Sequence, residues 1–291
     1  MIKKLTKKQY KEKEKKNKAK KTQIELALPK IPKLSQSLVK SLYNYKIGEE
    51  CGLKIEASYV NGINFPSTDT QELGNYFEYI CTNQLPRDGH IPVSKILKSG
   101  KPNTSYLRMD KQRENYIKIM KYYNFEVEQT GFVFTNPKYS GIADIIALDN
   151  NIKSTDINKK RIIIDIKTSG LINDKWSPYG WANIEEKWDL LVQAVHYKML
   201  AKYEWGIEDI PFYFMVFSNN NEVECKIFEI NLDESTKARH YQNLQNIQKY
   251  LDEIIKTGWE AKPELMRCSK CPLNISCLYQ LEVPTIQKVY V

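Results

Sequence analysis

The run RIIIDIKTS at residues 161–169 constrains the fold more than any other stretch of this sequence. It is apolar on both faces of the β-strand that it predicts, as is typical of a strand in the middle of a sheet. Side chains alternate along a strand, so Asp165 and Lys167 are expected to share one face. Charges at the end of a buried strand lose hydration unless they pair with each other or bind a metal. An isolated Asp-x-Lys pattern is common, and the alternative is a strand that ends in a solvated charge pair.

A second acidic residue lies in a stretch that predicts a hairpin. Residues 131–148 (GFVFTNPKYSGIADIIAL) contain two β-prone runs around a turn rich in Asn, Pro, Ser and Gly. Consecutive strands are usually neighbours in a sheet, so Asp144 of the second run is expected beside Asp165. Two converging carboxylates form a site that suits Mg²⁺, which prefers oxygen ligands. The alternative is that Asp144 caps a bulge or faces solvent.

A third acidic residue lies in a predicted helix. Residues 71–81 (QELGNYFEYIC) have apolar side chains at helical spacing, and Glu78 lies among them. A helix packed on the sheet could direct Glu78 toward the other two acids. The alternative is that Glu78 lies on a polar edge of the helix.

A further helix is predicted after the Asp-x-Lys strand, over residues 186–201 (EKWDLLVQAVHYKMLA). Gln193 and Tyr197 are four positions apart, so they lie on one face of that helix. Both side chains can contact a phosphate or a nucleobase. The neighbouring His196 points off that face, and we interpret it as an ordinary half-buried histidine.

The order of these motifs, over roughly residues 70–200, resembles the PD-(D/E)XK nuclease superfamily. It is similar in particular to the RecB-like branch, to which Q-x-x-x-Y belongs. The resemblance implies an α/β fold with a mixed central β-sheet flanked by helices, as in restriction endonucleases. Many members of the branch have a histidine where this chain has Phe77-Glu78, and glutamate at that place also occurs in the superfamily.

The same resemblance assigns roles to the side chains. The catalytic set that it implies is Glu78, Asp144, Asp165 and Lys167. The three acids and the backbone carbonyl of Ile166 would hold Mg²⁺ or Mn²⁺, and Lys167 would orient or help deprotonate the attacking water. DNA would be contacted by Gln193 and Tyr197.

The cysteines give an independent signal. The chain has six of them, and three form the pattern C-x₂-C-x₅-C at Cys268, Cys271 and Cys277. Such close spacing, in a chain without a visible secretory signal, indicates metal ligation rather than disulfides. Tetrahedral sulfur sites hold either Zn²⁺ or an iron–sulfur cluster, and spacing alone does not separate the two.

A subset of RecB-like nucleases resembles this cysteine pattern. AddB, the CRISPR-associated iron–sulfur exonucleases and related phage exonucleases are of this kind, with one cysteine before the nuclease core and C-x₂-C-x₅-C after it around a [4Fe–4S] cluster. The resemblance implies Cys51 as the fourth ligand, with Zn²⁺ as the alternative metal. Such a centre would join the two ends of the domain and lower the entropy of the unfolded chain. Cys81 and Cys225 are expected to be buried in a helix and a strand.

Positive charge is concentrated at one end of the chain. The formal net charge is +9, and residues 1–23 hold eleven lysines and two glutamates, which also gives +9. We expect residues 1–30 to be a disordered or loosely helical tail that binds DNA phosphates, or else a merely solvated tail. The expected organisation continues with a nuclease domain that includes the metal clamp at 31–280 and a short tail at 281–291.

Taken together, these patterns predict a Mg²⁺- or Mn²⁺-dependent DNA nuclease, and an exonuclease because the RecB-like branch mostly processes DNA ends. No stretch is apolar enough for a membrane span, and Pro102 stands where a phosphate loop after Gly100-Lys101 needs Ser or Thr, so the chain is not itself a helicase. We expect it in the cytoplasm of a bacterial or phage-infected cell. The resemblance admits DNA recombination, repair or spacer processing, with a helicase, recombinase or integrase as partner. The alternatives are a non-catalytic DNA-binding subunit and a zinc-stabilised interaction module.

Overall fold

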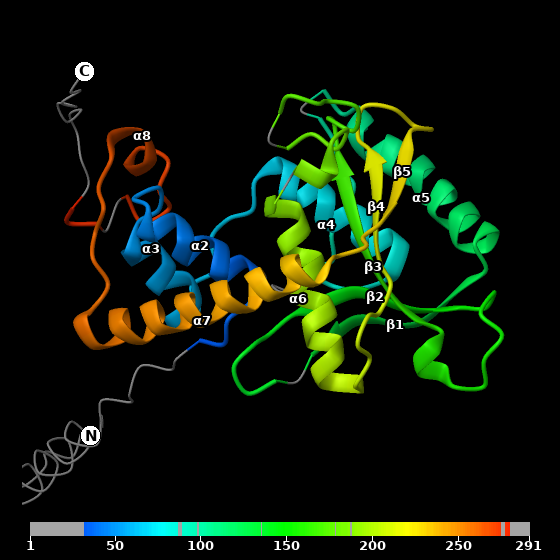
Figure 1. Cartoon of the computed structure of the whole chain (residues 1–291). Helices are drawn as coiled ribbons and strands as arrows, with labels where there is room; N and C mark the ends of the chain where they lie inside the picture. Colours follow the sequence, from blue (N-terminus) through cyan, green and yellow to red (C-terminus); the bar gives the residue numbers. More distant parts are fainter. Residues whose placement is uncertain are drawn as a thin grey trace, which may run out of the picture. The chain divides into compact units, whose positions relative to one another are not determined.

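A five-stranded mixed β-sheet forms the centre of the protein, as seen in a computed structural model (Figure 1). Its strands are β1 (Phe125–Val133), β2 (Ile142–Asp149), β3 (Arg161–Ser169), β4 (Phe212–Ser218) and β5 (Cys225–Glu229), and they neighbour one another in that order. Neighbouring strands are antiparallel except for β3 and β4, which are parallel. The apolar run of residues 161–169 is the middle strand, and residues 131–148 contribute to the β1–β2 hairpin, as predicted.

The structure describes residues 32–86, 89–97, 99–134, 136–177, 179–186, 188–274 and 277–279. The described residues from Lys33 onward form one compact unit. The expected basic tail at residues 1–30 and the expected C-terminal tail at 281–291 lie outside the described residues. In the described part, no helix has the length and apolar character that crossing a membrane requires.

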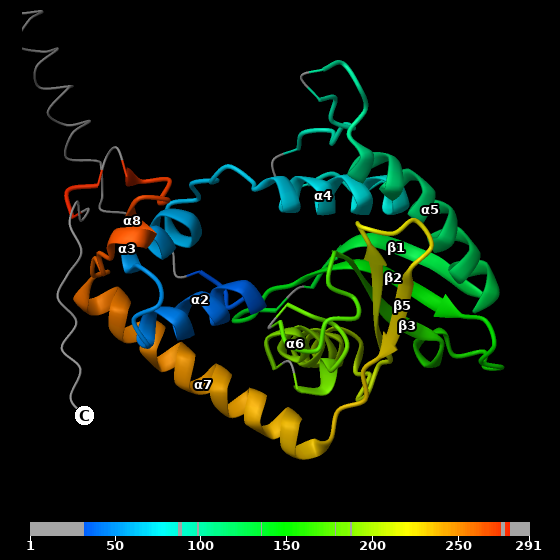
Figure 2. The same cartoon turned by 90° about the horizontal axis from the view of Figure 1, so that it is seen from above.

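Two helices cover one face of the sheet (Figure 2). They are α4 (Asp69–Thr82), which includes the predicted Glu78 helix, and α5 (Thr104–Tyr122). A capping box begins α4: the Thr68 hydroxyl accepts from the Gln71 N–H while the Gln71 side chain accepts from the Thr68 N–H. Beneath these helices lies an apolar core that contains Phe77, Met109, Ile162, Ile164 and Ile166.

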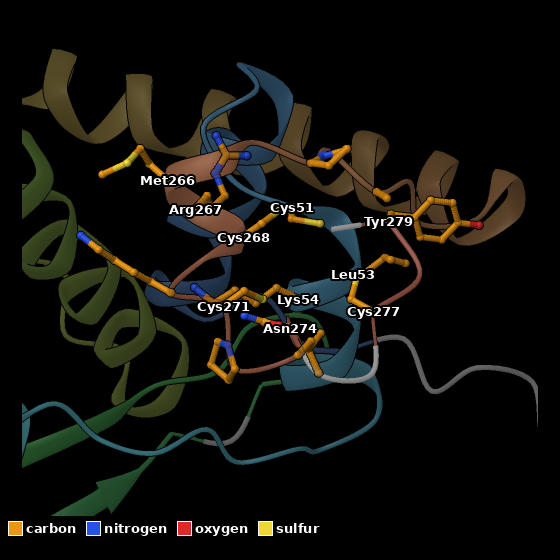
Figure 3. Close-up of a pocket in the computed structure, with 15 residues that line it drawn as sticks. Cys51, Leu53, Lys54, Met266, Arg267, Cys268, Cys271, Asn274, Cys277 and Tyr279 are labelled. Atoms are coloured by element: carbon orange, nitrogen blue, oxygen red, sulfur yellow. The ribbon is translucent and has the colours of Figure 1, made fainter. Parts of the chain in front are cut away.

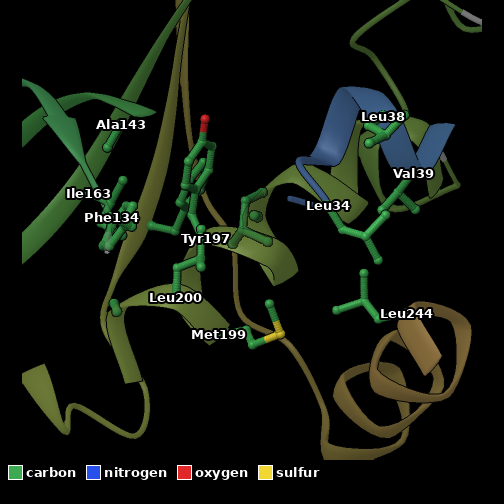
Figure 4. Close-up of a cluster of buried hydrophobic side chains, with 14 of the residues drawn as sticks. Leu34, Leu38, Val39, Phe134, Ala143, Ile163, Tyr197, Met199, Leu200 and Leu244 are labelled. Atoms are coloured by element: carbon green, nitrogen blue, oxygen red, sulfur yellow. The ribbon is translucent and has the colours of Figure 1, made fainter. Parts of the chain in front are cut away.

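The other face of the sheet packs against α6 (Trp188–Trp205), the helix that connects parallel strands β3 and β4. Two more helices pack with it, namely α2 (Gln36–Lys46) and α7 (Glu234–Thr257). Their shared core contains Leu38, Ile163, Leu200 and Leu244 (Figure 4). Because Ile163 faces this core, Asp165 and Lys167 lie on the α6 face by strand alternation. The mixed sheet with helices on both faces confirms the predicted α/β architecture of a mixed central sheet flanked by helices.

Segments from the two ends of the described chain lie side by side (Figures 1 and 2). The short helices there are α3 (Gly52–Ile55), which continues into a π-helix (Glu56–Val60), and α8 (Leu265–Cys268). The Tyr45 hydroxyl accepts a hydrogen bond from the Glu260 N–H at 3.1 Å, and Arg267 Nη2 donates to the Gly48 carbonyl at 3.0 Å. Two 3₁₀ turns, Ile157–Lys159 and Ile184–Glu186, complete the elements.

Candidate active site and cysteine site

The candidate active site lies where β2 and β3 separate. Their ladder pairing ends at Ile145 and Ile164. Beyond that point the carboxylate of Asp144 accepts a hydrogen bond from the Ile166 N–H at 2.8 Å. The side chain of one strand therefore binds the backbone of the other, and the gap between the strands holds Asp144 close to Asp165, as expected for neighbouring strands.

Asp165 is almost completely buried and lies between a lysine and a glutamine. Its carboxylate forms an ion pair with the Lys167 ammonium, as strand alternation predicts. Gln193 Nε2 donates to Asp165 Oδ1 at 2.5 Å. No donor in the described part of the chain reaches Oδ2 with hydrogen-bonding geometry, although this atom faces the lysine. Oδ2 therefore interacts with Lys167 as an ion pair.

Electrostatic coupling connects Glu78 to the other acids. Burial raises the pKa of Asp144 well above its usual range, and the negative charges of Asp165 and Glu78 raise it further. Burial also raises the pKa of Asp165, against the opposing effect of Lys167. Burial alone would lower the pKa of Lys167, but Asp165, Asp144 and Glu78 raise it overall. The sequence-predicted acids and lysine therefore lie within one electrostatic neighbourhood.

A cavity of about 440 Å³ opens beside these residues. Glu78 from α4, Asp144 from β2, and Gln193 and Tyr197 from α6 line it. The N-terminal end of α2 and the segment that precedes α4 also line it, with residues Ser35, Gln36, Ser37, Asn64, Phe65 and Ser67. Polar groups from segments far apart in sequence thus surround a space next to the acids.

Tyr197 also has a structural contact that the sequence did not reveal. Its ring lies in the core shown in Figure 4, and its hydroxyl donates to the Ile142 carbonyl at 2.6 Å. A Cβ atom on Gly141 would lie 2.8 Å from Tyr197 Cε1 and 2.6 Å from Leu200 Cδ1. The glycine of the G-x-x-D motif therefore lets α6 approach the beginning of β2 closely.

His196 is completely buried rather than half-buried. Its Nε2 lies 3.0 Å from the Ser140 carbonyl oxygen, and its ring meets that of His240 on α7 edge-on, with centroids 5.7 Å apart. In the described part of the chain, neither nitrogen of His240 has a hydrogen-bond partner. Burial lowers the pKa of His196 to about 4 and that of His240 to about 3. Sequence spacing did not predict this pair, because the two rings come from different helices.

The donor set fits a divalent cation. Three carboxyl groups outnumber the single ammonium here, and burial, together with the charges of Asp165 and Glu78, raises the pKa of Asp144. Oxygen ligands from carboxylates suit Mg²⁺ and Mn²⁺. As they stand, no three His, Cys, Asp or Glu side chains in the described ranges are grouped closely enough to hold a metal ion.

Four of the six cysteines surround a second cavity, of about 280 Å³ (Figure 3). They are the four that the sequence groups together, Cys51, Cys268, Cys271 and Cys277. Cys51 directly precedes α3, and the Lys262 N–H approaches its sulfur at 3.5 Å. Cys81 and Cys225 instead pack against the core under α4 and α5, where burial raises the pKa of both thiols.

Comparisons with known proteins bear on this arrangement. Residues 141–276 match a family model described as a PDDEXK-like domain of unknown function (DUF3799), which supports the PD-(D/E)XK resemblance. The chain is similar in structure to the Eubacterium rectale protein named "Putative exonuclease", with a TM-score of 0.58, 14% identity, and coverage of 98% of this chain and 97% of that one. At this identity the similarity shows a shared fold. Similarity to the alkaline exonuclease LHK-Exo of Laribacter hongkongensis is weaker, with a TM-score of 0.42, 10% identity, and coverage of 78% and 91%. Among curated proteins, none matches the sequence.

Proposed function

We propose that this protein is a metal-dependent DNA nuclease of the RecB-like PD-(D/E)XK type, and specifically an exonuclease. The observation that carries the proposal is the meeting of Asp144, Asp165 and Lys167 where β2 and β3 separate, beside a polar cavity that Glu78 also lines. The match to a PDDEXK-like family supports it. So does a fold shared over nearly the whole chain with the protein named "Putative exonuclease".

In this proposal Glu78, Asp144, Asp165 and the Ile166 carbonyl would hold Mg²⁺ or Mn²⁺. The cation would supply positive charge for the phosphate during in-line attack by water. Asp144 is positioned by the Ile166 N–H, and Asp165 by Gln193. Lys167 stays protonated because the acids raise its pKa, so it acts as a hydrogen-bond donor that orients water or a phosphate oxygen.

Gln193 and Tyr197 would contact DNA from the wall of the cavity. Their placement among its lining residues supports this role. Both are also committed to protein contacts, with Asp165 and with the Ile142 carbonyl, so their first task is to hold the site in shape. A DNA contact would then use the ring edge of Tyr197 and the remaining polar atoms of Gln193.

The second part of the proposal concerns the cysteine site. Cys51, Cys268, Cys271 and Cys277 would ligate a [4Fe–4S] cluster, with Zn²⁺ as the alternative. The cavity between them is mostly apolar, and Lys54, Arg267 and Lys270 also line it. Cationic side chains around an anionic thiolate cluster favour its charge. The metal centre would act as a structural clamp between the segments that contain α3 and α8.

The remaining assignments stay predictions from the sequence. Residues 1–30 would be a basic DNA-binding tail before the nuclease domain at 31–280, and residues 281–291 a C-terminal tail. Deletion of residues 1–23 should weaken DNA binding at low salt and flatten its salt dependence, because fewer phosphate counterions are released. A helicase, recombinase or integrase is the expected kind of protein partner.

The experiment uses the full chain, purified without oxygen, with end-labelled linear single- and double-stranded DNA. We expect hydrolysis only with Mg²⁺ or Mn²⁺. Asp165→Asn and Lys167→Ala should each lower the rate about a hundredfold or more. Asp156→Asn, at an exposed position before a 3₁₀ turn, is the matched control and should keep the rate.

Two outcomes would contradict the proposal. Absence of hydrolysis with either metal, or undiminished hydrolysis by both active-site variants, would exclude the nuclease assignment. Closed circular single-stranded DNA separates the two modes of cleavage, because an exonuclease needs an end. Cleavage of the circle at the rate of the linear strand would exclude the exonuclease part of the proposal.

A further inference from the structure

The segment that follows β3 carries two strongly exposed aromatic side chains. We call residues 170–181 the aromatic loop. In it the Trp176 side chain is 92% exposed and the Tyr179 side chain is 73% exposed. A single apolar residue at the surface is ordinary. Two large rings on one short loop contribute almost nothing to the hydrophobic stabilisation of the fold while they remain in water.

This loop is held in place, although its two rings are exposed. Ile172 and Trp181 at its two ends are buried. Between them, Asp174 Oδ1 accepts hydrogen bonds from the N–H groups of Trp176 and Ser177, both at 2.7 Å. An exposed ring on a fixed backbone loses less conformational entropy when it binds a ligand than a ring on a mobile backbone does.

The loop is anchored on the same face of the sheet as the proposed catalytic pair. The Trp181 ring packs edge-on against Phe214, with centroids 5.4 Å apart. Lys167 Nζ lies 5.9 Å from the centre of the same Phe214 ring. Phe214 is the ladder partner of Asp165 across β3 and β4. The anchor of the aromatic loop and the proposed catalytic lysine therefore contact one phenyl ring.

We propose that Trp176 and Tyr179 stack on unpaired nucleobases of the bound DNA strand, so that the nuclease acts on single-stranded DNA or on a single-stranded overhang. This inference rests on the proposed nuclease function and names its substrate class. In a duplex each base face is covered by the next base, whereas an unpaired base offers its face to an aromatic ring.

The composition of the loop favours DNA over a protein partner. Lys175 is exposed and directly precedes Trp176, so a cation stands beside the first ring, where the phosphate backbone of a stacked strand would run. Lys175 and Ser177 are the sequence neighbours of Trp176, so a charged and a polar residue stand on either side of the first ring in the chain. A protein interface core typically lacks charged residues.

The test measures binding of the full chain to a fluorescent oligothymidine and to a blunt duplex by anisotropy, without a catalytic metal. Trp176→Ala and Tyr179→Ala should each weaken binding of the oligothymidine about tenfold or more, the typical effect of losing one base stack. Trp176→Phe should keep most of the affinity, and binding of the duplex should not change. Tyr122→Ala is the matched control, because Tyr122 is 82% exposed on α5.

An abasic oligonucleotide tests stacking itself. A single abasic site is moved along the strand, and one position should weaken binding to the wild-type protein by about the same factor as Trp176→Ala. At that position the abasic site should have no further effect on the variant, because the same contact is already lost. In cleavage assays the variants should raise KM for single-stranded DNA and leave kcat nearly unchanged.

The outcomes separate this inference from the proposed function. If the wild type cleaves DNA and Asp165→Asn does not, yet the loop variants bind the oligothymidine normally, the stacking role is excluded and the nuclease function stands. If the loop variants differ from the wild type in oligomeric state but bind DNA normally, the loop is a contact between copies of this protein. That result would also exclude stacking. Loss of duplex and oligothymidine binding to the same extent would exclude selectivity for single strands.

Discussion

The carboxylate of Asp144 accepts a hydrogen bond from the backbone N–H of Ile166 at 2.8 Å, across the gap between β2 and β3. One side chain therefore has two tasks: it satisfies a backbone donor of the neighbouring strand, and it places an ionisable carboxyl group beside Asp165 and Glu78. The two tasks can be separated, because asparagine keeps an acceptor oxygen at the same place and loses the charge.

The first prediction compares Asp144→Asn with Asp144→Ala. Asparagine should lower DNA cleavage about a hundredfold or more, because the cation ligand is lost. The fold should keep its stability, since the Ile166 N–H retains an acceptor. Alanine should be equally inactive and should also lower the free energy of unfolding by about 1–3 kcal/mol. Initial rates and urea unfolding measure both effects, and a normal rate for asparagine would exclude Asp144 from the site.

The second prediction follows from the raised pKa of Asp144. A carboxyl whose pKa rises on folding stabilises the metal-free protein below its ordinary pKa of 3.8, and this contribution is lost as the pH rises through the raised value. Binding of Mg²⁺ or Mn²⁺ should therefore release a proton, and the affinity should increase with pH. Calorimetric titration in two buffers with different ionisation enthalpies measures the proton release. Fewer protons should be released when the metal binds to the Asp144→Asn variant. An unchanged proton release would contradict the role of Asp144 as the group that loses the proton.

A pair of glycines gives the third prediction. Gly141→Ala should destabilise the protein by about 1–3 kcal/mol, because the new methyl group would meet the side chains of Tyr197 and Leu200. Gly74→Ala in α4 is the matched control, since its Cβ would lie 3.6 Å from Thr168 Oγ1, an ordinary contact. In the helix interior alanine should stabilise by about 0.5–1 kcal/mol. Thermal unfolding measures both effects. If Gly141→Ala and Gly74→Ala changed the stability equally, α6 would not approach β2 closely at Gly141.

The fourth prediction concerns the cysteines. A change to serine at each cavity-lining cysteine should remove the metal and its brown colour, and it should lower the free energy of unfolding by about 2–4 kcal/mol. The positions are Cys51, Cys268, Cys271 and Cys277. The same change at Cys81 or Cys225 should leave the metal in place. Metal analysis distinguishes about four iron atoms per chain from about one zinc. Loss of metal from Cys81→Ser with retention in Cys51→Ser would overturn the choice of Cys51 as the fourth ligand.

The fifth prediction uses the two buried histidines. Their pKa values fall from 6.5 to about 4 for His196 and about 3 for His240. Below pH 6.5 the unfolded chain takes up protons that the folded protein excludes, so stability is complete above this pH and falls as the pH drops toward 4. The free energy of unfolding should fall by up to about 1.4 kcal/mol per pH unit for each histidine. Urea unfolding at several pH values measures it.

His240→Phe should flatten that dependence. It should also raise stability at neutral pH, because neither nitrogen of His240 has a hydrogen-bond partner in the described part of the chain. The exposed His90 offers a control, and His90→Gln should leave the slope unchanged. A pH profile that is the same for all three proteins would contradict the burial of the pair.

Much of the scaffold followed from periodicity in the sequence. The apolar run at 161–169 predicts a central strand, and alternation within it places Asp165 and Lys167 together. Helical spacing predicts α4 and α6. These features depend on residues a few positions apart, where the geometry of one element decides which side chains are neighbours.

What the sequence did not reveal depends on the relative placement of elements. The Asp144–Ile166 hydrogen bond forms beyond the last β2–β3 ladder pair, Ile145 and Ile164, and no local pattern marks where two strands separate. The contact of Tyr197 with Ile142 depends on how closely α6 approaches β2, for which the glycine in G-x-x-D was the available signal. The exposure of Trp176 depends on how the loop is anchored, whereas its composition alone would suit a buried position equally well.

Helix α2 connects the two cavities. Its first turn contributes Ser35, Gln36 and Ser37 to the wall beside the acids. At its other end, the Tyr45 carbonyl accepts a hydrogen bond from the Lys262 ammonium, in the segment that leads to Cys268. Eleven helical residues form a stiff rod about 16 Å long. One rigid element therefore ties the backbone beside the cysteine cavity to the polar wall beside the acids, so the two regions share a single mechanical frame.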